Sequence, residues 1–373
     1  MNLYFFLVFG FYFVGMLLLL TGWQQSLAGK SILPIEPFSF RKITVVVPFR
    51  NEEACIGNLI QDLIEQDYRP ESLEVILVDD HSTDRSSEII SLSISGRTRF
   101  RCVSLPDGKE GKKNAIACGV DLAGSEIMVT TDADCRLPVH WLQSILFSFH
   151  DANVKMVFGG VRIKEGKSFF SKIQALEFCS LIGAGASMAG LGIPVLCNGA
   201  NLAFLKSAFL EVHGYQGNLD IPSGDDEFLM HKINRRFPGS ICFQPSGDSV
   251  VETRPQETLK GFVDQRLRWA GKWKYSASSV SQLTATYILV LQASFLILWF
   301  APLLNLTSWL FTFLLIAAKM IFEFTFLFQV GTFLRVRQRP FHFLILQFLY
   351  PVYVIFIGLA ALFASPEWKG RKR

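Results

Sequence analysis

Charged residues are scarce in this 373-residue sequence, at 18% of the chain, against roughly a quarter in soluble proteins. Three windows contain no Asp, Glu, Lys or Arg: 1–29, 275–318 and 340–366. Apolar residues make up 50% of the chain, with an excess of Phe. The uncharged windows exclude a soluble cytoplasmic protein, and the charged residues between them exclude a protein that lies entirely within the membrane.

Paired cysteines, strong net charge and the common nucleotide-binding glycine motifs are also missing. The seven Cys are odd in number and show no C-x-x-C spacing, which favours reduced core cysteines in a cytosol-facing domain over disulfides or a zinc site. A net charge of +4 is too small to indicate nucleic acid as a partner. The charged middle has no G-x-x-x-x-G-K-[ST] or G-x-G-x-x-G motif, so neither a P-loop nor a dinucleotide site is indicated.

The N-terminal apolar stretch, residues 3–21, is long enough to span a membrane. A cleaved signal peptide is the alternative because residues 26–28 resemble a cleavage site, but no basic residue precedes the stretch. The first basic residues follow it: Lys30, Arg41 and Lys42. By the positive-inside rule, a transmembrane helix over 1–24 places the N-terminus outside and the charged middle in the cytosol.

Three further apolar runs, at 284–306, 308–330 and 342–364, predict about three transmembrane helices within 283–366. Four spans would put the basic tail 369–373 outside, against the positive-inside rule, so a re-entrant segment is an alternative and the count stays open. Lys319 and Glu323 lie one helical turn apart in the second run. They form either a functional intramembrane site or a self-neutralising ion pair.

The charged middle alternates short apolar runs with helical patterns. Four buried strands are predicted, at 43–47, 75–78, 102–105 and 127–131, with helices at 56–64, from Asp84 onward, and at 113–123. This alternation predicts an α/β domain with a parallel, twisted sheet. Ligands bind such sheets beyond the carboxyl ends of the strands.

Acidic residues occupy those strand ends: Asp79 and Asp80 after the second strand, and Asp132 and Asp134 after the fourth. Alone, an Asp-x-Asp could be an Asx turn at a strand exit. Four carboxylates at one sheet edge need a compensating cation, and oxygen ligands without His or Cys suit Mg²⁺ or Mn²⁺ completed by substrate phosphates. Gly111-Lys112-Lys113 adds positive charge at a helix start.

Six motifs follow one another in a specific order: Val47-Pro-Phe-Arg-Asn-Glu52, Val78-Asp-Asp-His-Ser-Thr-Asp84, Gly111-Lys-Lys-Asn-Ala-Ile116, Asp132-Ala-Asp134, Gly224-Asp-Asp226 and Gln265-Arg-Leu-Arg-Trp269. Together they resemble the membrane-bound, inverting family 2 glycosyltransferases, which include cellulose, chitin and hyaluronan synthases and ceramide glucosyltransferase. The resemblance covers about residues 41–275. It implies a GT-A (Rossmann-like) nucleotide-sugar-binding domain over 41–255, flanked by transmembrane α-helices, and an amphipathic interfacial segment over 256–282.

The resemblance also assigns roles to individual residues. For the donor, Glu52 and Asp80 would hold the nucleoside, Lys112 would approach the base or phosphates, Asp132 would contact ribose or phosphate, and Asp134 would ligate Mg²⁺ or Mn²⁺. For the acceptor, Asp226 would be the general base, Gln265, Arg268 and Trp269 would close over the diphosphate and line the acceptor path, and Cys197–Ala200 would shape its pocket. Leaving-group stabilisation by cations and one base opposite the leaving group suit an inverting displacement.

Two of these motifs have simpler interpretations. Residues 223–227 read equally as an acid-rich helix start. The segment around Trp269 and Trp273 alternates basic and apolar residues before a span, as in an interfacial amphipathic helix.

The predicted function is transfer of a sugar, from a UDP-sugar by family expectation, to a lipid or lipid-linked glycan by an integral protein of the plasma or inner membrane. A processive polysaccharide synthase is the main alternative. A third hypothesis is a catalytically silent scaffold or a transporter. A silent scaffold would be expected to lose the acidic residues, but all of them are present, and the paired repeats of broken spans typical of a transporter are not found.

Overall fold

The computed structural model describes residues 1–28, 41–219, 221, 223–271, 279–363, 367–368 and 371–372. They form two compact units, each built from separate stretches of chain. A helical unit comprises Met1–Gly22, Glu165–Gly183 and Pro255–Arg373, and a sheet unit comprises Trp23–Lys164 and Ala184–Arg254. The segment 165–183 lies inside the predicted 41–255 domain but groups with the helical unit.

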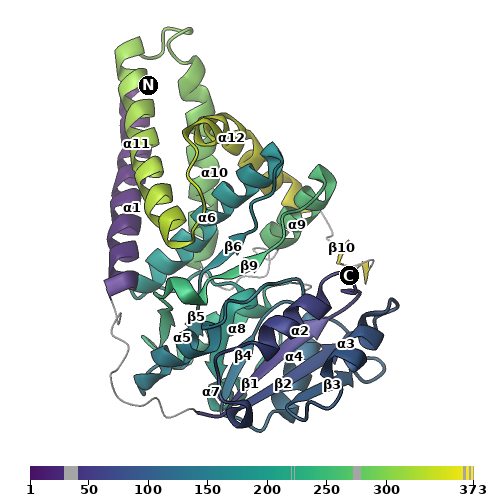
Figure 1. Cartoon of the computed structure of the whole chain (residues 1–373). Helices are drawn as coiled ribbons and strands as arrows, with labels where there is room; N and C mark the ends of the chain where they lie inside the picture. The colour runs from purple at the N-terminus through teal and green to yellow at the C-terminus, as the bar shows by residue number, and fades with distance from the viewer. Residues whose placement is uncertain are drawn as a thin grey trace. The chain divides into compact units, whose positions relative to one another are not determined.

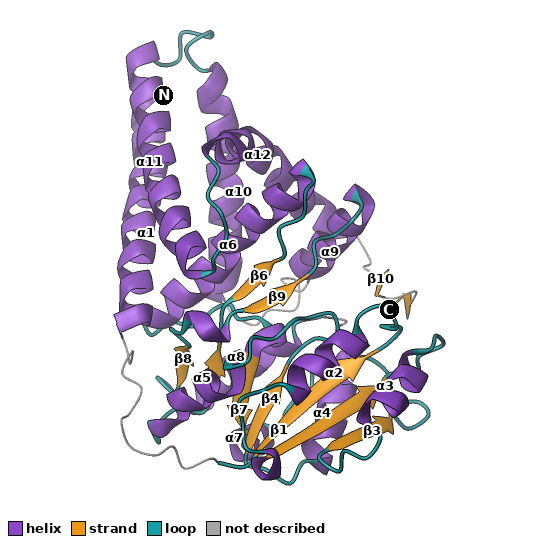
Figure 2. Cartoon of the chain, in the orientation of Figure 1, coloured by secondary structure: helices purple, strands orange, loops and turns teal. Residues whose placement is uncertain are grey.

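The sheet unit is built on a seven-stranded sheet with the order β3-β2-β1-β4-β7-β5-β8 (Figures 1 and 2). Its strands are β1 Ile43–Phe49, β2 Leu73–Asp79, β3 Phe100–Ser104, β4 Ile127–Thr130, β5 Met156–Phe158, β7 Leu202–Leu205 and β8 Ile241–Phe243. The four predicted strands are therefore confirmed as β1 to β4, and β1, β2 and β4 carry the apolar runs that mark a strand buried on both faces.

Helices and short turns complete the sheet unit. They are α2 Ile56–Ile64, α3 Ser86–Ile94, α4 Lys112–Leu122, α5 Trp141–Phe147, α7 Lys206–Glu211 and α8 Asp225–Arg236, with 3₁₀ turns at Pro70–Ser72, Ser148–His150, Gly199–Asn201 and Gly247–Ser249. A two-stranded parallel ribbon pairs β6 Val161–Ile163 with β9 Val251–Thr253. Helix α4 packs closely on β1, since a Cβ on Gly119 would lie 2.3 Å from the Val46 side chain.

The sheet is mixed, so the prediction of a parallel sheet is correct only for part of it. Strands β1 to β4 are parallel, and β5 is parallel to β8, but β7 runs antiparallel between β4 and β5. Apolar periodicity identifies a buried strand but carries no information on its direction, which depends on the connection that leads into it. The α/β class with flanking apolar helices is confirmed.

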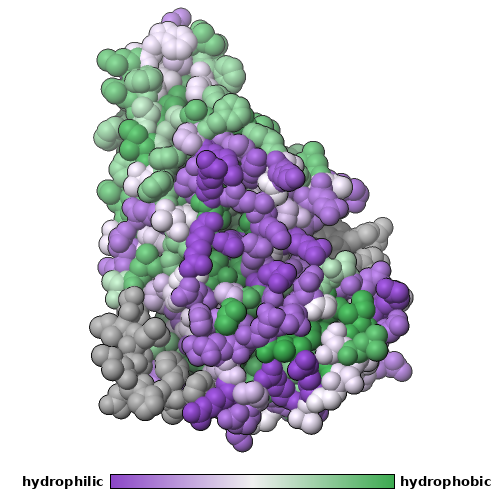
Figure 3. Space-filling model, viewed as in Figure 1, coloured by the Kyte–Doolittle hydropathy of each residue, from purple (hydrophilic) through white to green (hydrophobic). Residues whose placement is uncertain are grey.

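The helical unit contains four helices that are long and apolar enough to cross a membrane, counted over the described residues: Asn2–Ala28, Gln282–Phe300, Trp309–Phe333 and Pro340–Phe363. Its elements are α1 Asn2–Ala28 up to Gly22, α6 Phe169–Gly190 up to Gly183, α9 Leu259–Gly271, α10 Ser279–Phe300, α11 Trp309–Phe333 and α12 Pro340–Phe363, with the short strands β10 Glu367–Trp368 and β11 Arg371–Lys372. Large apolar side chains such as Phe11 and Phe313 are exposed on α1 and α11, where Figure 3 shows many hydrophobic residues.

A polar network lies among these apolar helices. Lys319 pairs with Glu323 at 2.8 Å, and its ammonium group donates to Gln347 on α12 at 2.9 Å. Glu323 also accepts hydrogen bonds from Gln347 and from Tyr12 on α1, at 2.7 and 2.8 Å. These contacts favour the self-neutralising interpretation of the Lys319 and Glu323 charges, extended by two neutral partners.

Candidate active site

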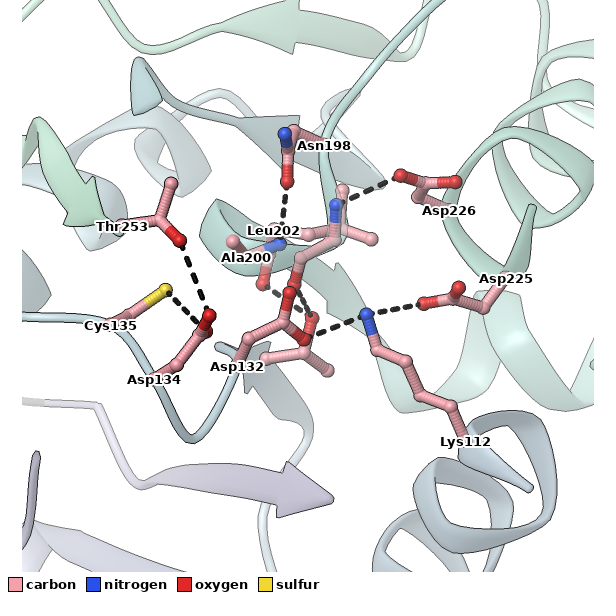
Figure 4. Close-up of polar contacts among 12 residues, drawn as sticks. Lys112, Asp132, Asp134, Cys135, Asn198, Ala200, Leu202, Asp225, Asp226 and Thr253 are labelled. Atoms are coloured by element: carbon pink, nitrogen blue, oxygen red, sulfur yellow. Dashed lines mark hydrogen bonds and ion pairs between the residues drawn. The ribbon is translucent and has the colours of Figure 1, made fainter. Parts of the chain in front are cut away.

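A lysine connects two acids at the carboxyl edge of the sheet. Lys112, the first residue of α4, lies 2.8 Å from the carboxylate of Asp132 after β4 and 3.0 Å from that of Asp225, the first residue of α8 (Figure 4). The Lys112 side chain is 22% exposed and that of Asp225 only 12%. The ion pairs bring the ends of three elements together around one partly buried ammonium group.

The charges in this cluster stabilise one another against burial. Burial alone would lower the pKa of Lys112, but the carboxylates of Asp132, Asp225 and Asp226 raise it well above its usual value. Burial alone would raise the pKa of Asp225, but the ammonium group of Lys112 holds it below its ordinary value. Both groups are therefore charged at neutral pH, and Lys112 acts as an internal counterion.

The second acid of α8 has a different partner. The backbone N–H of Gly199 donates to Oδ2 of Asp226 at 3.0 Å (Figure 4). Gly199 is held in turn, because the Thr130 hydroxyl donates to its carbonyl oxygen at 3.0 Å and the Asn198 side chain accepts from the N–H of Ala200 at 2.9 Å. The turn at 198–201 thus orients the predicted general base.

Asp134 lies beside Thr253 and Cys135, away from Lys112 (Figure 4). The Thr253 hydroxyl donates to its Oδ2 at 3.5 Å, and the Cys135 thiol lies 3.8 Å from its Oδ1. Within the described ranges, no three His, Cys, Asp or Glu side chains are grouped so that they could hold a metal ion. Asp132 and Asp134 offer carboxylate oxygens, and this donor set fits Mg²⁺ or Mn²⁺ with a shell completed by phosphate oxygens.

The contacts and burial of the two acids after β2 differ from those that the sequence predicts. Asp79 accepts from the Ser82 N–H at 2.8 Å and from the Ser87 hydroxyl at 3.0 Å, so its carboxylate stabilises the following turn. Because Asp79 is used in the turn and Lys112 already compensates Asp132, the four carboxylates at this edge need less added positive charge than the sequence alone predicts. Asp80, predicted to hold the nucleoside, is almost fully buried, at 1% exposure.

The loops after β1 and β2 are joined by several hydrogen bonds. The Arg50 guanidinium donates to the Asp80 carbonyl oxygen at 2.7 Å, and the N–H of Glu52 donates to the Ser86 hydroxyl at 2.7 Å. Asn51, in the left-handed region at φ 54°, accepts from the Thr83 N–H at 2.8 Å. These bonds fix Glu52 and Asp80 on adjoining loops, while their role toward a nucleoside stays a prediction.

The remaining predicted residues lie on α9 in the helical unit. The Gln265 side-chain oxygen accepts from the Arg266 guanidinium at 2.8 Å, and the same guanidinium stacks 4.2 Å from the Trp269 ring. Arg268 lies on the same helix, partly exposed. Trp273, Lys272 and Lys274 lie outside the described residues. The sequence interpretation gave Arg266 no role of its own, and no local signal distinguishes it from the neighbouring basic residues.

Comparison with known families identifies the chain. The model of glycosyl transferase family group 2 matches residues 127–363, which is more than half of the sequence, and that of glycosyl transferase family 2 matches residues 44–209. The chain belongs to glycosyltransferase family 2. The resemblance and the enzyme class inferred from the six motifs are thus confirmed.

Relatives of this glycosyltransferase include poly-beta-1,6-N-acetyl-D-glucosamine synthases. It is 28% identical over 233 residues to the poly-beta-1,6-N-acetyl-D-glucosamine synthase of Staphylococcus aureus strain COL, covering 61% of the present chain and 53% of the synthase. The synthase of the same name from Staphylococcus epidermidis is 26% identical over 235 residues, with the same coverage of both chains. The chain spans about half the length of the curated relatives it matches.

The fold of the glycosyltransferase is also found among solved structures. The mannosyltransferase PcManGT from Pyrobaculum calidifontis, described in complex with GDP-Man and Mn²⁺, matches with a TM-score of 0.65 at 19% identity, over 97% of this chain and 99% of that one. At this identity the match establishes the GT-A fold.

Proposed function

We propose that this glycosyltransferase moves a sugar from a nucleotide-sugar to a lipid or lipid-linked glycan at the cytosolic membrane face, by an inverting single displacement. The observation that carries the proposal is that two adjacent acids, Asp225 and Asp226, have different contacts. Asp225 is neutralised by Lys112, whereas Asp226 is oriented by the Gly199 amide. An oriented carboxylate is suited to remove the proton of an acceptor hydroxyl, and a single base opposite the leaving group gives inversion.

The donor is assigned to the loops after β1, β2 and β4. Glu52 and Asp80 would hold the nucleoside, Asp132 would contact the ribose or a phosphate, and Asp134 would hold the diphosphate through Mg²⁺ or Mn²⁺. A bound divalent cation would neutralise the charge that develops on the departing nucleoside diphosphate. The ion pairs of Lys112 support a role in keeping Asp132 in place, in addition to any contact with the donor.

The acceptor is assigned to the membrane side. Gln265, Arg268 and Trp269 on α9 would line its path and close over the diphosphate. The four apolar helices support an integral membrane protein. The plasma or inner membrane, with the sheet unit in the cytosol, is the location that we propose from the positive-inside rule. An acceptor carried by a lipid would reach such an enzyme from the bilayer.

A processive polysaccharide synthase is the second candidate, favoured by the names of the staphylococcal relatives. It would require a path for the polymer among the apolar helices. In the helical unit, a cluster of buried side chains from α1 and α10, joined by Ala301 and Ile316, fills the contact between these helices: Phe5, Phe9, Phe295 and Leu298. This packing closes the contact between α1 and α10 to a polymer, so a processive enzyme would need a path elsewhere.

The test uses the purified full chain in nanodiscs with Mn²⁺, a panel of UDP- and GDP-sugars, and total membrane lipid as acceptor. We expect release of nucleoside diphosphate together with a glycolipid of inverted anomeric configuration. Asp226→Asn should lower transfer by ~10²-fold or more while leaving donor binding nearly intact. Glu227→Gln, one residue along the same helix, is the matched control.

Three outcomes of this experiment would contradict parts of the proposal. A product ladder of increasing length would replace single transfer by processive synthesis. Full activity in Asp226→Asn would remove the assigned base, and absence of transfer from every donor to every lipid fraction would refute the proposed function.

A further inference from the structure

Arg266 lies inside the Gln-x-x-Arg-Trp motif at a position to which the motif assigns no role. Its side chain is 3% exposed and pairs with Glu177 on α6, whose side chain is 5% exposed, at an Nη2–Oε2 distance of 2.5 Å. The Tyr353 hydroxyl on α12 donates to the other oxygen of Glu177 at 3.4 Å. Arg266 therefore anchors α9 to two other helices of the same unit.

The same guanidinium also contacts both ends of the motif. Its Nη1 donates to the side-chain oxygen of Gln265 at 2.8 Å. Its central carbon lies 4.2 Å from the Trp269 ring centre and 4.6 Å from that of Phe262. The next residue after Glu177, Phe178, places its ring 6.1 Å from Trp269. A single buried group thus touches two residues predicted to act on the acceptor and diphosphate.

Only an arginine can make these contacts together. A guanidinium is planar, so it stacks on an aromatic ring while its N–H groups form hydrogen bonds in the plane, whereas an ammonium group is a compact point charge. Burial alone would lower the pKa of Arg266, but Glu177 raises it, so the group stays charged. The carboxylate of Glu177 is needed to compensate this charge, because a buried guanidinium without its carboxylate would be strongly unfavourable.

We propose that Arg266, held by Glu177, is a positioning residue that fixes Gln265 and Trp269 in the geometry needed for sugar transfer. This inference rests on the proposed function, since it assumes that the motif acts in transfer. Glu177 on α6 holds the guanidinium of Arg266 in place, and the guanidinium in turn holds the Gln265 amide and the Trp269 ring.

The test compares full-length variants in nanodiscs by two independent measurements. Hydrogen exchange over residues 259–271 reports on the order of α9, and steady-state kinetics separates kcat from the KM for the donor. Arg266→Lys keeps the charge facing Glu177 but loses the stacking and the fork of N–H groups. Glu177→Gln removes the carboxylate charge. Glu165→Gln is the matched control, since Glu165 pairs with Arg339 at 2.6 Å in the same unit but makes no contact with α9 among the interactions described.

We expect Arg266→Lys and Glu177→Gln to speed exchange over 259–271 and to lower kcat about 10-fold, while the donor KM changes less than about twofold. The control should change neither. Unchanged exchange in both variants would overturn the inference, as would faster exchange with wild-type kcat, because the motif would then not need its position. If the wild-type chain transfers no sugar, the proposed function fails, whereas the exchange comparison still decides whether Arg266 orders α9.

Discussion

Replacing Lys112 with Met tests whether this residue is an internal counterion even when no donor is bound. Lys112→Met keeps the length of the side chain but leaves the carboxylate of Asp225, 12% exposed, without its ammonium partner at 3.0 Å. Removing one partner of a fully buried ion pair costs about 3–5 kcal/mol. Because Lys112 is 22% exposed and water can reach the site, we expect about 2 kcal/mol. In the sheet unit this would lower the melting temperature by about 4–8 °C.

A double-mutant cycle separates this counterion role from donor binding. Asp225→Asn removes the carboxylate charge, so adding it to Lys112→Met should recover much of the lost melting temperature, with a coupling of about 1–3 kcal/mol between the two sites. The measurement is thermal unfolding of the full chain in detergent without nucleotide, where a residue that contacts only the donor contributes nothing. Additive losses in the double variant would refute the counterion assignment.

Three further predictions follow from the site and the membrane helices. Asp134→Ala should abolish the Mn²⁺-dependent part of nucleoside diphosphate binding in calorimetry while leaving the melting temperature nearly unchanged; affinity that still depends on Mn²⁺ would remove the metal assignment. Gly199→Ala adds a Cβ 3.0 Å from the Asp225 carboxylate and 3.1 Å from the Lys112 ammonium group, so we expect transfer to fall about 10-fold with a smaller change in donor affinity, and equal losses in both would contradict this. Lys319→Met should lower the melting temperature in detergent, because Glu323 is left without its cation. The double variant with Lys319→Met and Glu323→Gln should be more stable than Lys319→Met alone.

The pH dependence of stability has a definite sign at Asp225. Lys112 holds the pKa of this carboxyl below its unfolded value, against the effect of burial. The stabilisation is therefore complete above the unfolded pKa and is lost as the pH falls through the lower, folded pKa. Lys112→Met should reduce this loss on the acid side, which thermal unfolding from neutral pH down to below the folded pKa of Asp225 would measure.

Much of the sheet could be predicted because its central strands carry a strong local signal. In β1 and β2, long apolar runs end directly in polar loop residues, and such runs mark strands buried on both faces. The strands β5, β7 and β8 were missed, since each has only three or four residues and a short apolar run has no distinctive period. Helix α6 is not predicted from the sequence either, because its second half contains Gly183, Gly185 and Gly190, and glycine has a weak preference for helix.

The partners of charged residues could not be predicted for a different reason. Lys112 and Asp225 are more than a hundred positions apart, and so no spacing rule links them; the ion pair exists only because α4 and α8 both begin at the same edge of the sheet. Without that pairing, the sequence interpretation gave Lys112 to the donor and treated the acids as a cluster in need of a metal. The pair between Glu177 and Arg266 escaped notice for the same reason.

The adjacent acids of α8 show what the structure adds to the motif. In the sequence, Asp225 and Asp226 are equivalent as acids at a helix start, and only the resemblance selects the second as the base. Successive residues of an α-helix point about 100° apart, so the two carboxylates necessarily face different surroundings. One meets the Lys112 ammonium group and the other the Gly199 N–H. A carboxylate in a direct ion pair with a lysine is a poor proton acceptor, so the geometry disfavours Asp225 as the base, and Asp226 remains the base that the resemblance predicts.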